Sequence, residues 1–146
     1  MSQERSAEVM RLYLEEAVGK GNLDVIDTFT ADDFIDHSQP DNRGPAALRA
    51  HAGGFRENFP DVQIEVQRII ASDDEVAGVW RLKGTQTKSL FGLPATNREL
   101  EFTVVSLFKL RDEMLVDYIV VAGALEAIVQ MGVKVELPAA AKASPI

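Results

Sequence analysis

The chain has 146 residues, of which 46% are apolar and 26% charged, as is usual for a single globular domain that builds its own core. The net charge of −8 and the lack of a basic run argue against nucleic acid or an anionic membrane as a partner. The absence of cysteine excludes disulfides, a thiolate nucleophile and cysteine-bound metal.

The chain offers little to hold a metal or a cofactor. Its two histidines, His37 and His51, fit no standard zinc spacing, and there is no glycine-rich phosphate loop. We therefore expect neither a metal nor a bound cofactor. The N-terminus lacks an apolar signal core and no apolar run is long enough to span a bilayer, so we expect a cytoplasmic protein.

The first 60 residues are predicted to be largely helical. Apolar residues at helical spacing predict a helix over residues 6–20, with Ser6 as its N-cap. Asn22 is expected to cap a short second helix. A strand-like piece follows over residues 34–37.

A third helix is predicted from Pro45 to about Asn58. Gly53 and Gly54 lie inside this helix and weaken it by roughly 1 kcal/mol each relative to alanine. They indicate close packing against a neighbour, or mobility.

The rest of the chain is predicted to form a sheet. Alternation of apolar and polar residues predicts a strand over residues 62–71, and residues 75–110 resemble two long antiparallel strands joined by an elaborate loop. A fourth strand over residues 115–121 and a closing helix over residues 124–131 follow. This order indicates an α+β cone, in which a curved antiparallel sheet packs against N-terminal helices around an apolar cavity.

The strand that begins at Glu75 is the most informative element. Its alternation predicts an inward lane that ends at a polar residue: Val76, Gly78, Trp80, Leu82, Gly84 and Gln86. A polar group at the end of an apolar lane is typical of a pocket wall, although Gln86 could equally face water at the strand end. Outward positions such as Val79, Val105 and Leu107 are too apolar for water, so we expect a homodimer through the open sheet face.

Five short motifs, in order and at matching spacing, are similar to one known family. They are Phe34-Ile-Asp-His37, Phe59-Pro-Asp61, Gly84-Thr-Gln-Thr87, Phe91-Gly-Leu-Pro-Ala-Thr96 and Gln130-Met-Gly132. Over nearly its whole length the chain resembles the SnoaL-like polyketide (ester) cyclases, a branch of the nuclear transport factor 2-like superfamily. The resemblance implies that residues 1–133 form the cone domain. Residues 134–146 would be a tail that is flexible or lies at the dimer interface.

The resemblance also implies an activity. Family members close a ring on an aromatic polyketide ester by intramolecular aldol condensation, without a cofactor, and His37 matches their pocket histidine. Two positions depart from the pattern: Gln86 stands where the family often has histidine, and Ala122 or Gly123 stands where the family has its catalytic aspartate. The resemblance therefore predicts the cone fold and its pocket more firmly than it predicts the aldol mechanism.

Several side chains are candidates for the site. We predict His37 as the catalytic base, because imidazole exchanges protons near neutral pH, while His51 is expected to be a helix-packing residue. The predicted substrate-binding residues are Trp80, Gln86, Ser106, Tyr118, Phe55 and Phe91. Asp36 could orient His37, and Glu126 is a further candidate acid.

Three functions remain open on the sequence. The first is a polyketide cyclase-type enzyme acting by acid–base chemistry on an apolar small molecule. The second is a relative with a changed reaction, such as hydroxylation of an aromatic polyketide. The third is a non-catalytic cone that binds an apolar ligand. The missing aspartate favours the last two, and the retained His37 favours the first two.

Overall fold

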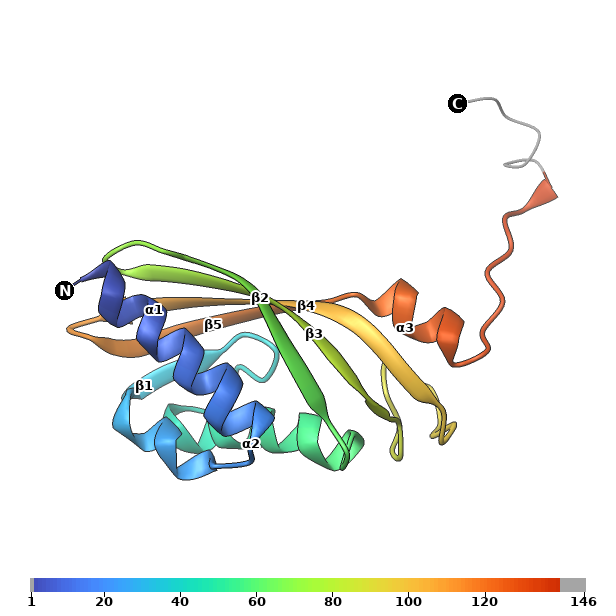
Figure 1. Cartoon of the computed structure of the whole chain (residues 1–146), viewed down its shortest axis with the longest axis horizontal. Coiled ribbons are helices and arrows are strands. Elements are labelled where there is room, and N and C mark those ends of the chain that lie inside the picture. The colour runs from blue at the N-terminus through green and yellow to red at the C-terminus, as the bar shows by residue number, and fades with distance from the viewer. Residues whose placement is uncertain (1, 140–146) are drawn as a thin grey trace.

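The computed structural model describes residues 2–139 of the chain, and its centre is a curved five-stranded sheet (Figure 1). The strand order is β1-β5-β4-β3-β2, with β1 and β2 as the free edges. Neighbouring strands are antiparallel except β1 and β5, which run parallel. The strands are β1 (Thr30–Asp36), β2 (Gln63–Ala71), β3 (Glu75–Thr85), β4 (Glu99–Arg111) and β5 (Met114–Ala122). The mixed α+β class and the curved sheet agree with the sequence prediction.

The helical segments are α1 (Gln3–Arg11), η1 (Leu12–Gly19), η2 (Leu23–Thr28), α2 (Gly44–Asn58) and α3 (Ala124–Gln130). The prediction that Ser6 caps the first helix is wrong. Ser2 is the cap, since its hydroxyl accepts a hydrogen bond from the Arg5 amide at 3.1 Å. Ser6 is buried one turn later, and its hydroxyl donates to the carbonyl of Asp73. Asn22 does precede η2, but its side chain makes no capping hydrogen bond.

The inward lane predicted for β3 is confirmed. Val76, Trp80, Leu82 and Gln86 are each at most 1% exposed, and Gly78 and Gly84 are buried with them. The alternate residues are half-buried or exposed: Ala77, Val79, Arg81, Lys83 and Thr85. The core side chains of β4 and β5 face the same way, because side chains alternate along a strand. They meet the helices on one side of the sheet in a single apolar cluster.

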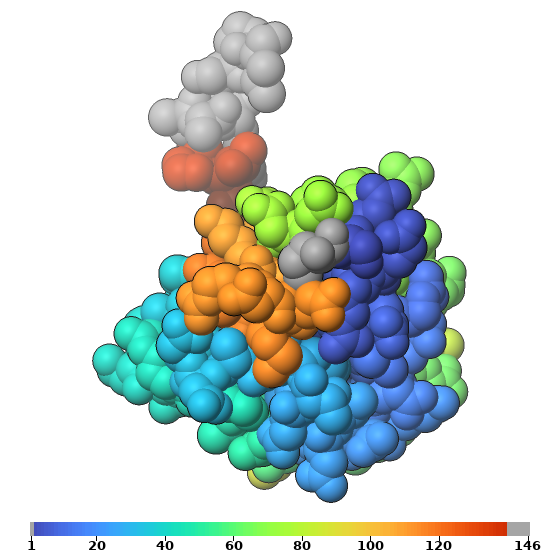
Figure 2. All heavy atoms as spheres, turned by 90° about the vertical axis from the view of Figure 1, so that its left-hand side faces the viewer, coloured from blue at the N-terminus to red at the C-terminus, as the bar shows by residue number. Residues whose placement is uncertain are grey.

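One end of the cone is closed by two hairpin turns. Figure 2 looks onto this end, where the β2–β3 turn (green) and the β4–β5 turn (orange) lie beside α1 (blue). The amide of Leu110 donates to the carbonyl of Asp74 at 2.8 Å and so joins the two turns. The Ser6 hydroxyl ties α1 to the first of them.

The middle of the cone is filled with aromatic side chains, where the sequence predicts an apolar cavity. Tyr13 contacts Phe108 and Tyr118 edge-to-face, with ring centroids 5.2 and 5.8 Å apart, and all three are buried. Trp80 of β3 and Phe102 of β4 are buried as well. The hollow that remains lies beside α2 and is described below.

Two polar side chains hold the wide end of the sheet. The carboxylate of Asp61 accepts hydrogen bonds from both the amide and the hydroxyl of Thr85 at 2.7 Å, which fixes the chain entering β2 against the end of β3. The amide side chain of Gln130 bonds the Glu101 N–H at 2.7 Å and the Glu101 carbonyl at 2.8 Å. It pairs with β4 beyond the end of β5 and anchors α3. Three of the sequence motifs, those that contain Asp61, Thr85 and Gln130, thus have a structural role.

The segment after α3 leaves the body of the domain (Figure 1). Residues 134–139 are exposed, and the remainder of the predicted tail, residues 140–146, lies outside the described residues. No helix among the described residues is long and apolar enough to cross a membrane.

Gly84 provides a test of the packing at the wide end. A Cβ at this position would lie 2.9 Å from Phe59 Cβ, which is too close, and 3.1 Å from an Asp61 carboxylate oxygen, which is tighter than an ordinary contact. Overpacking of this kind costs about 1–3 kcal/mol. Gly84→Ala should therefore lower the free energy of unfolding by about that amount in urea titration, with an unchanged m-value. A variant as stable as the parent would mean that the Phe59–Asp61 segment can shift freely.

Candidate functional site

The site begins where β1 ends. Asp36 lies opposite Tyr118 in the parallel pairing of β1 with β5, and Ile35 lies opposite Asp117. Phe34 and Asp36 share the inward face of β1 and are both 0% exposed. The carboxylate of Asp36 is therefore inside the domain, one residue before the loop that leads to α2.

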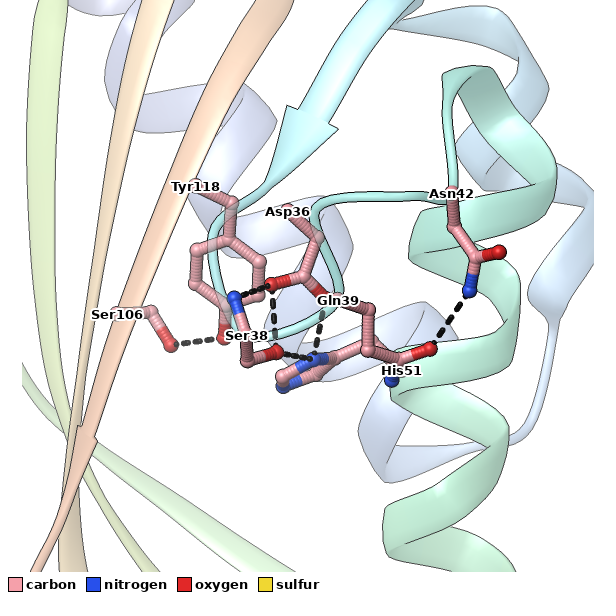
Figure 3. Close-up of polar contacts among 7 residues, drawn as sticks. All are labelled: Asp36, Ser38, Gln39, Asn42, His51, Ser106 and Tyr118. Carbon is pink, nitrogen blue, oxygen red and sulfur yellow. Dashed lines mark hydrogen bonds and ion pairs between the residues drawn. The ribbon is translucent and has the colours of Figure 1, made fainter.

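The buried carboxylate of Asp36 is fully matched by donors (Figure 3). One oxygen lies 2.8 Å from Nδ1 of His51 on α2, and the other accepts the amide and the hydroxyl of Ser38 at 2.9 and 2.7 Å. The side chain of His51 is 9% exposed. Since Nδ1 faces a carboxylate, it carries the proton, and Nε2 at the far edge of the ring is left as the basic nitrogen.

These contacts also set the acidity of Asp36. Burial alone would raise the pKa of the carboxyl group, but the hydrogen bonds from His51 and Ser38 outweigh it and lower the pKa below its ordinary value. The carboxylate therefore stays ionised beside His51, and it can stabilise a positive charge that arrives on the imidazole.

A hollow of about 360 Å³ opens beside His51 and is called here the α2 hollow. One wall is a stripe of α2 at helical spacing, formed by His51, Gly54, Phe55 and Asn58. Ser38 and Gln39 of the β1–α2 loop, Ala50, Phe59 and Leu90 complete the lining. The size is within the range of small-molecule sites.

A chain of buried polar groups lies behind the α2 hollow. The indole N–H of Trp80 donates to the hydroxyl of Ser106 at 3.1 Å, and Ser106 shares a hydrogen bond of 3.0 Å with the hydroxyl of Tyr118. Burial raises the pKa of the Tyr118 phenol well above its ordinary value, so the group stays protonated. The Tyr118 ring also contacts the His51 ring, with centroids 4.9 Å apart. Three predicted site residues thus come together next to His51.

Phe55 separates this buried chain from the α2 hollow. Its ring contacts His51 and Trp80 edge-to-face, with centroid distances of 5.3 and 5.4 Å. It is half-buried and lines the hollow. The structure thus brings together four of the predicted substrate-binding residues: Phe55, Trp80, Ser106 and Tyr118.

Gln86 and Phe91 lie elsewhere. The Gln86 amide donates to the carbonyls of Lys88 and Pro94 and accepts from the amide and hydroxyl of Thr96, so it ties the two arms of the β3–β4 loop together. Its fully bonded side chain does not line the α2 hollow. Phe91 is at the loop tip, 44% exposed, and Leu90 beside it reaches the hollow instead.

The structure places His37 on the outer side of the sheet. Its Nε2 lies 2.7 Å from a carboxylate oxygen of Asp117, and its side chain is 47% exposed. Asp36 therefore pairs with His51, and its neighbour His37 does not line the α2 hollow. A catalytic role of His37 stays a prediction. Glu126 is also outside the hollow, paired with Arg81 at 2.9 Å.

The sequence held one signal that identifies the inward residue. Phe34 is a large apolar residue at the start of the strand-like piece, so alternation places Asp36 inward and His37 outward. The partner could not be found in this way, because His51 is 15 residues further along and on a helix. Among residues 2–139, no group of three or more histidine or carboxylate side chains is arranged to hold a metal ion.

The curved, open sheet and the helices on one side define a protein of the nuclear transport factor 2-like cone fold. The family model described as SnoaL-like polyketide cyclase matches residues 7–131. The chain therefore belongs to the SnoaL-like polyketide cyclase family, as the motifs predicted. No curated protein matches the sequence.

Solved structures show the same fold at low sequence identity. TsrD from Streptomyces laurentii has a TM-score of 0.80 and 17% identity, over 90% of this chain and 98% of TsrD. A SnoaL-like polyketide cyclase from Agrobacterium tumefaciens has a TM-score of 0.75 and 16% identity, over 90% of this chain and 100% of that chain. AclR from Streptomyces galilaeus, a candidate hydroxylase, has a TM-score of 0.73 and 23% identity, over 99% of this chain and 95% of AclR. These likenesses concern the fold.

Asp36 should make the protein sensitive to acid. Because folding lowers its pKa, its stabilising effect is present above the unfolded-state pKa of about 4 and is lost as the pH falls through the lower folded-state value. Asp36→Asn should destabilise the protein by about 1.5–3 kcal/mol at pH 7 and flatten the loss of stability below about pH 4. Urea titrations at several pH values measure both effects.

The matched control is Asp33→Asn, which removes a carboxylate of the same strand from an exposed pair with Arg111. It should cost less than about 1 kcal/mol. Equal effects of the two substitutions would contradict the special role of Asp36.

Proposed function

We propose that this protein is a cofactor-free acid–base enzyme that cyclises an aromatic polyketide or a similar apolar small molecule by aldol-type chemistry. The observation that carries the proposal is the Asp36–His51 pair at the wall of the α2 hollow. Membership of the SnoaL-like polyketide cyclase family supports the reaction class. His51, and not His37, is the proposed base.

The proposed reaction uses the free nitrogen of His51. Nε2 removes a proton from a carbon next to a carbonyl group of the substrate, and Asp36 stabilises the imidazolium that forms. The carbanion attacks a second carbonyl carbon of the same molecule, which forms the new carbon–carbon bond and leaves an alkoxide. The imidazolium returns its proton to that oxygen, so His51 ends the cycle neutral. The apolar side chains of Phe55, Phe59 and Leu90 would hold the substrate beside His51.

The buried hydroxyls have a supporting part in this proposal. Ser106 and Tyr118 share one hydrogen bond, and the Trp80 N–H occupies another position on Ser106. Both hydroxyls are buried and neither lines the α2 hollow, so they do not contact the substrate. Their part is to hold the Tyr118 ring in place against the His51 ring, 4.9 Å away.

A second function is favoured by one observation. Neither Ala122 nor Gly123 supplies the carboxylate that the family resemblance implies after the last strand. The protein could then bind an apolar molecule in the α2 hollow without turning it over. A changed reaction, such as the hydroxylation suggested for AclR, is the remaining alternative and would require a co-substrate.

The two histidines can be separated by substitution. His51→Gln should lower kcat on a panel of aromatic polyketide esters by about 10²–10⁴-fold, because it removes the base while keeping a polar side chain of similar size. His37→Ala should leave kcat within a few-fold, since its ring is on the outer side of the sheet. Steady-state kinetics with each variant, after a check of folding by circular dichroism, provides the comparison.

The outcomes divide the alternatives. Full activity of His51→Gln together with an inactive, folded His37→Ala would restore His37 as the base. Tight binding of a panel member by the parent with no turnover would favour the non-catalytic function.

The assembly that accompanies this function is proposed to be a homodimer through the outer sheet face. Side chains from three strands lie in register there, Val79 opposite Val105 opposite Val121, and Ala77 opposite Leu107 opposite Ile119. Val121 and Ile119 are 62% and 44% exposed. A continuous apolar patch of this kind is typical of an interface, and a second copy presents the same patch.

Light scattering at micromolar concentration should give a dimer mass for the parent and a monomer mass for Val121→Glu, because a buried, unpaired charge opposes association. Leu125→Glu is the control, since Leu125 is equally exposed, at 62%, but lies on α3. A monomeric parent would disprove the dimer.

A further inference from the structure

Gly54 is a glycine that the fold itself does not require. It lies in the middle of α2, where glycine weakens a helix relative to alanine. It is not among the residues with a positive φ, so its backbone conformation is open to any residue. A Cβ built on it would meet no atom within 4 Å, so no neighbouring element needs the close approach that glycine permits.

The place of Gly54 gives it a different role. It belongs to the α2 stripe that lines the hollow, one turn after His51 and one turn before Asn58. Gly54 is exposed and a Cβ there would meet open space, so a side chain at this position would extend from the wall of the hollow. The glycine leaves the helix backbone uncovered at one position between His51 and Asn58, which are about 10 Å apart along the helix at 1.5 Å per residue.

The surroundings of this uncovered backbone are suited to a flat ligand. Phe55, Phe59 and Leu90 supply apolar surface around it, and Ser38 and Gln39 supply polar groups at the side of the β1–α2 loop. Figure 3 shows these two loop residues near His51. A planar ring system can lie against exposed backbone at van der Waals distance, whereas a side chain at position 54 would lift it away.

We infer that Gly54 determines ligand specificity by leaving the wall of the α2 hollow flat, so that a planar, fused-ring aromatic molecule lies against α2 between His51 and Asn58. This inference rests on the proposed use of the hollow as the ligand site, but not on the reaction proposed there. It explains why a helix that gains nothing structurally from glycine has one at this position.

Gly53 provides a matched control within the same helix. It is the adjacent residue, it has no positive φ, and it is not part of the hollow. A Cβ there would make only an ordinary contact of 3.9 Å with Leu23. Alanine at either position should favour the helix equally and raise the melting temperature by about 2–4 °C. The two substitutions therefore differ only in what they do to the hollow.

The experiment measures binding of 1,8-dihydroxyanthraquinone, a planar three-ring probe, by fluorescence titration and calorimetry. Gly54→Ala should raise Kd about tenfold, because a methyl group that obstructs a close-fitting ligand has an effect of this size, and Gly54→Leu should raise it further. Gly53→Ala should change Kd less than about twofold. Both alanine variants should melt at or above the parent temperature, which excludes unfolding as the cause.

Each outcome decides the inference. Equal binding by Gly54→Ala and the parent would overturn it, as would an equal loss in Gly53→Ala, or no binding by the parent up to millimolar probe. The predicted loss of binding, observed in a protein that turns over no polyketide ester, would uphold the inference and count against the proposed reaction.

Discussion

The burial of one carboxylate constrains the rest of this site. Asp36 is 0% exposed, and an ionised carboxylate in that environment is tolerated only when donors surround it. Two donors come from Ser38, which fixes the turn after β1, and the third comes from His51. The same carboxylate therefore sets the path of the loop, the rotation of α2 and the tautomer of the imidazole.

This constraint extends through aromatic contacts to the far strands of the sheet. The His51 ring packs on Tyr118, and Tyr118 is linked through Ser106 to Trp80 on β3. Because the interior is filled by these rings, the space available to a ligand lies at the surface of α2 and not in the middle of the cone. Phe55 stands at the boundary between the two regions.

The family resemblance therefore concerns the fold, whereas the ionisable residues of the site differ from the pattern that the resemblance implies. The fold is shared with structures at 16–23% identity, since a curved sheet with helices on one side requires only a pattern of apolar residues. The position after β5 that the resemblance assigns to an acid holds Ala122 and Gly123. Under the proposed mechanism the ionisable pair lies instead on β1 and α2, with Asp36 opposite Tyr118 of β5.

Much of the architecture could be predicted from local patterns. The period of two along β3 identified the buried lane from Val76 to Gln86, and the period of 3.6 identified α2, because both depend only on neighbours in the sequence. The same patterns missed that Ser2 caps α1 and that β1 pairs with β5 in parallel, since a hydroxyl near a helix start has several equivalent competitors and a long-range pairing has no local signature.

The sequence by itself determined which residue types were available: two histidines, no cysteine, inward-facing Trp80, Ser106 and Tyr118, and a glycine pair within α2. Only the tertiary structure decided which histidine meets a carboxylate. Asp36 and His37 are adjacent in the chain but point to opposite faces of β1, while His51 reaches Asp36 from another element. Neighbouring residues of a strand point to opposite faces, so Asp36 and His37 are separated. The packing of α2 across the end of β1 brings His51, which is 15 residues further along the chain, to Asp36.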